Sequence, residues 1–199
     1  MFAKIVKKFS VSLKTFGIRR TLFWIYFGYL KINTFFLYKK DLREETLSLA
    51  VPSNVSIEKI PIDKLRLLRE SERHLPIEFY YDLIDGVETC FIAYIDNQPA
   101  HIMWIYFKAN PSRFFSLDDG EAEIGYMVTL PQFQRMGINP IVITNAFRWL
   151  KENGYGKIYI STHRDNVAAI KSIERSGFKR IGEVKYYGLL SFLEKMFKG

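Results

Sequence analysis

Apolar residues recur along the chain with two periods, one typical of strands and one typical of helices. Strands are predicted at residues 55–60, in a hairpin at 89–108 that turns at Asp96–Asn97, and at 121–130, 157–163 and 178–190. Helices are predicted at residues 62–84, interrupted at Pro76, and at 140–153 and 165–177, which end at Gly154 and Gly177. The order β, α, α, β, β, β, α, β, α, β predicts a mixed α/β domain over residues 55–199.

The first 40 residues have a different pattern. A helical stripe of apolar residues with lysines between them covers residues 2–16, and an uninterrupted apolar run follows at residues 22–30. A transmembrane helix needs about 20 apolar residues, so we expect no membrane span. A small-residue cleavage site is missing after the run, so we expect no cleaved signal peptide. Residues 1–40 are therefore predicted to form a basic, aromatic, amphipathic helical extension, joined by a linker at 41–54.

Charge separates this extension from the rest of the chain. The net charge is +8, but residues 1–40 hold nine Lys and Arg and no acidic residue, so the remainder is close to neutral. Charge therefore gives no support for nucleic-acid binding by the main domain. For the extension, two roles stay open: peripheral contact with an anionic membrane, or docking on the domain or a partner.

Cysteine and histidine suggest little chemistry of their own. Cys90 is the single cysteine, which fits a reducing compartment and a cytoplasmic location, and its place in an apolar strand predicts a buried side chain. The three histidines, His74, His101 and His163, show no metal-ligand spacing, so no metal site is predicted. The oligomeric state stays open.

The stretch PQFQRMGINP at residues 131–140 lies between a predicted strand and a predicted helix. Gly137 and Asn139 readily accept positive φ, and Pro140 suits the first position of a helix. Such a bend points backbone N–H groups into the positive end of a helix, which is a geometry that binds phosphate. An ordinary strand–turn–helix connection is the alternative interpretation.

Two motifs in this context resemble those of the GNAT superfamily of acyl-CoA-dependent N-acyltransferases. The residues QRMGIN resemble its pyrophosphate motif, Arg/Gln-x-x-Gly-x-Gly/Ala, although Asn139 replaces the usual Gly or Ala. Asn166, Ala169, Gly177 and Phe178 resemble its second CoA-side helix and the strand that follows. The resemblance implies a central mixed sheet flanked by helices, acetyl-CoA as co-substrate and a small-molecule amine as acceptor. The whole chain also resembles GNAT proteins of bacterial cell-surface polysaccharide gene sets, which makes an amino sugar one candidate acceptor.

The same resemblance implies roles for individual residues. The backbone of Met127, Val128 and Thr129 would pair with the pantetheine, and Asn166 would contact the same arm from a helix that includes Ala169. The pyrophosphate would lie on the amides of the bend, which is formed by Gln134, Arg135, Met136, Gly137, Ile138 and Asn139. Arg135 would add its charge.

For catalysis, the sequence offers a base more readily than an acid. Glu123 lies 11 residues before Gln134, the spacing of the glutamate base in one branch of the family, and Glu121 is the second candidate. Strand alternation predicts Glu123 and Tyr126 on opposite faces. The acid position of many family members falls on Ile173, so Tyr186 or Tyr187 is a candidate substitute, and protonation of the thiolate by solvent is the alternative. A catalytically silent module that binds CoA or a partner at the membrane face is the alternative function, and acylation with a longer chain also stays open.

Overall fold

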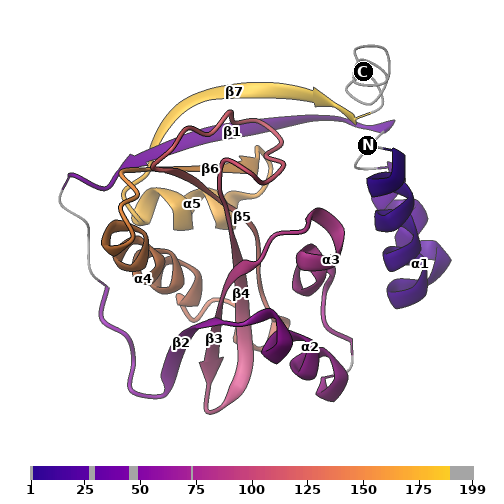
Figure 1. The fold of residues 1–199 in the computed structure, drawn as a ribbon, viewed down its shortest axis with the longest axis horizontal. Helices are drawn as coiled ribbons and strands as arrows, with labels where there is room; N and C mark the ends of the chain where they lie inside the picture. The colour runs from indigo at the N-terminus through magenta and orange to yellow at the C-terminus, as the bar shows by residue number, and fades with distance from the viewer. Residues whose placement is uncertain (1, 27–29, 45–48, 73, 189–199) are drawn as a thin grey trace.

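The computed structural model describes residues 2–26, 30–44, 49–72 and 74–188. In these residues a seven-stranded sheet has the order β2-β3-β4-β5-β6-β1-β7 (Figure 1). Neighbouring strands are antiparallel except β5 and β6, which are parallel. The strands are β1 Ile32–Asp41, β2 Val55–Ile60, β3 Thr89–Ile95, β4 Gln98–Tyr106, β5 Glu121–Thr129, β6 Lys157–His163 and β7 Lys179–Tyr187. The helices are α1 Phe2–Ile25, α2 Ile62–Ser71, α3 Tyr81–Asp85, α4 Ile138–Glu152 and α5 Val167–Arg175, with short 3₁₀ turns η2 Ile77–Tyr80 and η3 Pro131–Phe133.

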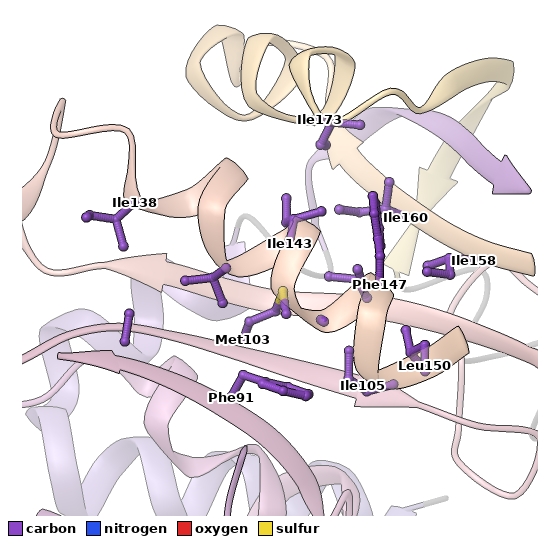
Figure 2. Close-up of a cluster of buried hydrophobic side chains, with 14 of the residues drawn as sticks. Phe91, Met103, Ile105, Ile138, Ile143, Phe147, Leu150, Ile158, Ile160 and Ile173 are labelled. Atoms are coloured by element: carbon purple, nitrogen blue, oxygen red, sulfur yellow. The ribbon is translucent and has the colours of Figure 1, made fainter. Parts of the chain in front are cut away.

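Two apolar cores lie on opposite faces of the sheet. On one face α4 packs across the strands, and Figure 2 shows Phe147 and Leu150 of this helix over Met103 and Ile105 of β4. On the other face α2, η2 and α3 cover a second core. Every residue of β4 except Gln98 is buried, because helices cover both of its faces. The two cores hold the middle of the sheet rigid beneath the site.

From residue 55 onward the predicted elements are confirmed, with small shifts at their ends. Asp96 and Asn97 both have positive φ, as a tight hairpin turn requires, and Cys90 is fully buried. Helix α4 begins at Ile138 and not at Pro140. Pro140 is tolerated there because the first four N–H groups of a helix have no acceptor within it. The predicted tail at 191–199 lies outside the described residues.

The helical extension predicted for residues 1–40 is wrong for its last part. Residues 32–41 form β1, which is hydrogen-bonded to β6 on one side and to β7 on the other. Strand β1 is therefore an interior strand of the domain. Its central residues, Phe35 to Tyr38, are apolar on both faces, so the strand lacks the two-residue alternation that would have revealed it.

Helix α1 is a pair of helical segments broken at Gly17, whose φ of 75° and ψ of 174° are not helical. The hydroxyls of Ser12 and Thr21 are 3.0 Å apart and both side chains are buried, so the two segments fold back on each other. The pair packs beside α3 (Figure 1). No helix in the described ranges is both long enough and apolar enough to cross a membrane.

Candidate functional site

The site begins where two parallel strands separate. Strand β5 pairs with β6 only from Glu121 to Ile124, so its second half has no partner on that side. On its other side the pairing with β4 shifts register between Ile102 and Trp104, and Tyr126 has a φ of 46°. Together these observations describe a β-bulge. A positive φ at tyrosine is strained, and such strain concentrates at functional sites.

The bulge changes the face on which Tyr126 lies. Glu123 is directly opposite Tyr106 of β4, so these two side chains share a face. The extra residue in the bulge returns Tyr126 to this same face, where its ring stacks on Tyr81 with centroids 3.6 Å apart. The prediction that Glu123 and Tyr126 face opposite sides is therefore wrong, because strict alternation fails at a bulge.

A cavity of about 340 Å³ occupies the gap between the strands. Its lining comes from both sides of the sheet: Glu78, Tyr106, Ser112, Arg113, Glu123 and Tyr126 at one end, Met127, Asn166, Ala169 and Ile173 at the other, and Phe35 and residues 161–163 along the wall. This cavity has carboxylates and aromatic rings at one end and the side-chain amide of Asn166 at the other, so it can bring two different reactants together.

Glu123 is the most perturbed carboxylate in this cavity. Its side chain is 6% exposed, and its Oε2 is buried without a hydrogen-bond partner. Burial raises the pKa of Glu123 to about 7, although Ser112 and the charge of Arg113 favour its ionised form. A carboxylate with this pKa accepts a proton efficiently near neutral pH.

Glu121, the second candidate base, is engaged elsewhere. Its carboxylate accepts hydrogen bonds from the Lys157 ammonium at 3.0 Å, from the Tyr159 hydroxyl at 3.2 Å and from the Asp118 amide at 3.2 Å. Burial opposes its charge, but these donors hold the pKa of Glu121 below its ordinary value. It does not line the cavity, and its contacts tie β5 to β6 and to the end of the preceding connection.

The bend after β5 has the geometry expected of an anion cradle. Gly137 caps α4 with a φ of 74°, and Arg135 has a φ of 67°. Residues 134–137 are all exposed. The side-chain amide of Gln134 donates to the Thr129 carbonyl at 3.3 Å, which ties the bend to the end of β5. Positive φ was predicted at Asn139 as well, but this residue lies in the first turn of α4 and Arg135 takes the second left-handed position.

The bend also fits the diphosphate of a CoA molecule. The first amides of α4 have no acceptor within the helix, and the helix dipole adds positive potential there. A Cβ built on Gly137 would meet nothing within 4 Å, so the space in front of the bend is open.

The other predicted cofactor residues are placed in two groups. Asn166 caps α5 by accepting a hydrogen bond from the Ala169 amide at 3.1 Å, and both residues line the cavity. Met127 lines it too. Val128 and Thr129 pair with β4, and the Thr129 hydroxyl is 2.8 Å from Nδ1 of His101. Their unpaired edge faces the gap to β6.

Tyr186 does not line the cavity. Its ring packs edge-on against Phe35 and Phe114, and the guanidinium of Arg113 lies 5.3 Å from its centroid. Ile173, at the position where many family members have an acid, is fully buried and lines the cavity. Two other phenols from the described residues line the cavity. The Tyr126 hydroxyl accepts a hydrogen bond from Arg113 at 3.1 Å, whereas the Tyr106 hydroxyl donates one to Asp85 at 3.1 Å.

Sequence reasoning missed four lining residues that matter: Phe35, Glu78, Arg113 and Tyr126. Phe35 was hidden in the misread strand β1, and Tyr126 by the bulge. Glu78 and Arg113 lie in connections whose path cannot be read from periodicity. The one available signal was that the connection with Arg113 leads directly into β5, the strand that carries Glu123, whereas Glu78 lies in η2, between α2 and α3.

With this geometry established, comparison with known proteins decides the family. The profile of the Acetyltransferase (GNAT) family matches residues 56–178, more than half of the chain. The chain belongs to the GNAT family. The matched region runs from β2 to the residue before β7. Strand β1 lies outside it. No match was found among curated proteins.

Solved structures share the GNAT fold at low sequence identity. A GCN5-related N-acetyltransferase from Kribbella flavida matches with a TM-score of 0.52 and 12% identity, over 85% of this chain and 62% of that one. A GNAT acetyltransferase from Colwellia psychrerythraea matches with a TM-score of 0.50 and 18% identity, over 78% and 56%. The glucosamine N-acetyltransferase region of a fungal multi-domain β-N-acetylglucosaminidase matches with a TM-score of 0.54 and 15% identity, over 84% and 22%. The chain thus covers less than two thirds of each of these proteins.

Proposed function

We propose that this GNAT protein transfers an acetyl group from acetyl-CoA to a primary amine of a small molecule. The observation that carries the proposal is the cavity between β5 and β6, which is lined by a buried carboxylate of raised pKa. The bend at residues 134–139 does not line this cavity, but Gln134 ties it to the end of β5. Acetyl-CoA supplies an activated acyl group as a thioester. The chain supplies position, a proton acceptor and a proton donor.

Each role has a candidate residue. The amides of residues 134–139 hold the diphosphate, and Asn166 and the unpaired edge of β5 hold the pantetheine arm. Glu123 takes the proton that an ammonium must lose before its nitrogen can attack. The phenol of Tyr126 is protonated at neutral pH, since burial raises its pKa, and it can return a proton to the leaving sulfur. Positioning two reactants in this way can lower a barrier by roughly 7–11 kcal/mol.

An amino sugar is a candidate acceptor. The fungal region with the same fold is described as a glucosamine N-acetyltransferase. A cavity of about 340 Å³ is of the size that holds a small ligand. The single cysteine and the use of acetyl-CoA favour the cytoplasm as the compartment, and the basic, apolar α1 favours contact with an anionic membrane.

A silent CoA-binding module is the second candidate, and Ile173 at the usual acid position favours it. The two are separated by measuring thiol release from acetyl-CoA with a panel of amino sugars, nucleotide amino sugars and polyamines. Catalysed release with any of them supports the transferase. Stabilisation by acetyl-CoA without any release supports the module.

The cofactor site has its own test. In Gly137→Ala a left-handed alanine costs about 1–2 kcal/mol, and relief of this strain would move the amides of the bend, so we expect CoA affinity to fall several-fold in isothermal titration. Gly154→Ala is the matched control, because Gly154 has a φ of 83° at the far end of α4. It should lose similar stability and keep its CoA affinity. Equal affinities in the two variants would contradict the assignment of the bend.

A further inference from the structure

Arg113 occupies an unusual position at the acceptor end of the cavity. Its guanidinium lies among four aromatic rings, 5.7 Å from the centroid of Phe35, 5.8 Å from Phe114, 5.7 Å from Tyr126 and 5.3 Å from Tyr186. One of its nitrogens donates to the Tyr126 hydroxyl at 3.1 Å. The side chain lines the cavity and is exposed to it.

The charge of Arg113 is not balanced by an ion pair. Among the described residues no carboxylate lies within ion-pair distance of it, although Arg69, Arg43 and Arg180 each have one. The nearest acids act on it only at longer range: Arg113 favours the ionised form of Glu123, and Asp85 favours the charged form of Arg113, but neither carboxylate forms an ion pair with it. A guanidinium has five N–H donors in a planar fork, and the hydrogen bond to Tyr126 uses one of them. The remaining donors can bind an anion from solution.

The connection that carries Arg113 is well ordered by its own contacts. The Asn110 side chain accepts from the Phe107 amide at 2.9 Å, and the Ser112 hydroxyl accepts from the Phe115 amide at 3.0 Å. Aromatic rings on several sides then fix the guanidinium itself. A cation held in advance loses little entropy when it binds a ligand.

We propose that the acceptor amine also carries an anionic group, a carboxylate or a phosphate, and that Arg113 binds this group while the nitrogen faces Glu123. This inference rests on the proposed transferase function and narrows its substrate class. Arginine binds both kinds of anion through two parallel hydrogen bonds, so the guanidinium alone does not distinguish carboxylate from phosphate. Amines of the same skeleton without the carboxylate or phosphate lack the group that Arg113 recognises.

The test compares amines that differ only in the anion. One pair is glucosamine 6-phosphate and glucosamine, and a second is β-alanine and β-alaninamide, so the phosphate and carboxylate sources are scored separately. We expect kcat/KM for thiol release to favour the anionic member of at least one pair by about 10- to 100-fold, the range for a hydrogen bond to a charged group. In Arg113→Gln the ratio of kcat/KM between the anionic amine and its counterpart should fall close to one.

Two further variants make the comparison sharp. Lys108→Gln removes a cation from the same connection, but Lys108 is exposed and does not line the cavity, so the preference should be unchanged. Arg113→Lys keeps the charge without the fork and should keep part of the preference. If Arg113→Gln lowers the rate for both members of a pair equally, Arg113 is structural and the inference is wrong.

Binding gives a readout that needs no turnover. Isothermal titration of each amine into the protein with CoA present should show the same preference in Kd, again lost in Arg113→Gln. Preferential binding without thiol release would support the role of Arg113 and contradict the transferase assignment. Thiol release with no preference for the anionic amines would do the reverse.

Discussion

Glu123 and Glu121 are two residues apart on one strand, yet their environments move their pKa values in opposite directions. Three donors surround the Glu121 carboxylate, so its charged form is stabilised. Glu123 lies in the cavity with one oxygen unpartnered, so burial favours its neutral form. Side-chain identity and spacing cannot separate these two carboxylates, and their neighbours from β6 and from residues 107–120 do.

Glu123→Gln should therefore change both stability and rate. Because the folded-state pKa, about 7, exceeds the ordinary 4.5, the folded protein binds the extra proton between these values and loses stability as pH rises through them. The variant avoids this loss, so its unfolding free energy should exceed that of the wild type at pH 8 by up to about 3 kcal/mol and equal it at pH 4. Denaturant unfolding at both pH values measures the difference.

In contrast to its higher stability, Glu123→Gln should have a lower rate of acetyl transfer. In the wild type kcat/KM should rise with pH with an apparent pKa near 7, and Glu123→Gln should lower it by roughly 10²-fold or more and remove this dependence. Glu121→Gln is the comparison, because it should lose stability at pH 7 through its broken pair with Lys157 while keeping the pH profile. A fully active Glu123→Gln protein would exclude Glu123 as the base.

At the scale of elements, the predictable parts are those with one covered face or a clear stop. Helices α4 and α5 have an apolar side and end at Gly154 and Gly177, and the β3–β4 hairpin turns at Asp96–Asn97, so local sequence specifies them. The bend at residues 134–137 was predictable for the same reason. Strand β1 was not, because both of its faces are packed and its partners are distant in sequence. The bulge at Tyr126 was not either, since nothing local marks a tyrosine for positive φ.

Strand β1 changes what can be removed from the chain. A domain that began at residue 55 would tolerate loss of everything before it. Instead, deletion of residues 1–25 should leave a cooperatively folding protein, whereas deletion of residues 1–41 should not, because β6 and β7 would lose the strand between them. Thermal unfolding followed by circular dichroism distinguishes the two. Cooperative unfolding of the shorter protein would show that the sheet closes without β1.

For the molecule as a whole, the apolar and basic residues of the N-terminal segment are partly exposed at the surface of α1. Exposed apolar side chains gather on and just after α1, and they are Leu13, Ile18, Leu22, Phe23, Tyr26, Leu30 and Ile32. Lys14 and Arg19 lie exposed on the same segment. Helix α1 packs beside α3, and α3 supplies Tyr81, whose ring stacks on that of Tyr126 at the cavity.

The membrane proposal can be tested with this surface. The double variant Leu22→Glu, Phe23→Glu should reduce binding to phosphatidylglycerol vesicles at least about tenfold, because burial of each side chain is worth about 1.5–3 kcal/mol. Leu67→Glu, at a residue of α2 that is 64% exposed, is the matched control and should bind normally. Co-sedimentation with anionic and with neutral vesicles measures the electrostatic and the apolar contribution to binding. Equal binding by all three proteins would assign α1 a different partner.

The position of β1 also has a consequence for the nascent chain. Of the seven strands of the sheet in the described residues, this one leaves the ribosome first, yet its two neighbours, residues 157–163 and 179–187, follow after the other four. For about ten seconds at common elongation rates, an aromatic segment with two open hydrogen-bonding edges has nothing native to pair with. A stalled or prematurely terminated product would keep those edges open. Translation of residues 157–187 therefore decides whether β1 is protected from aggregation.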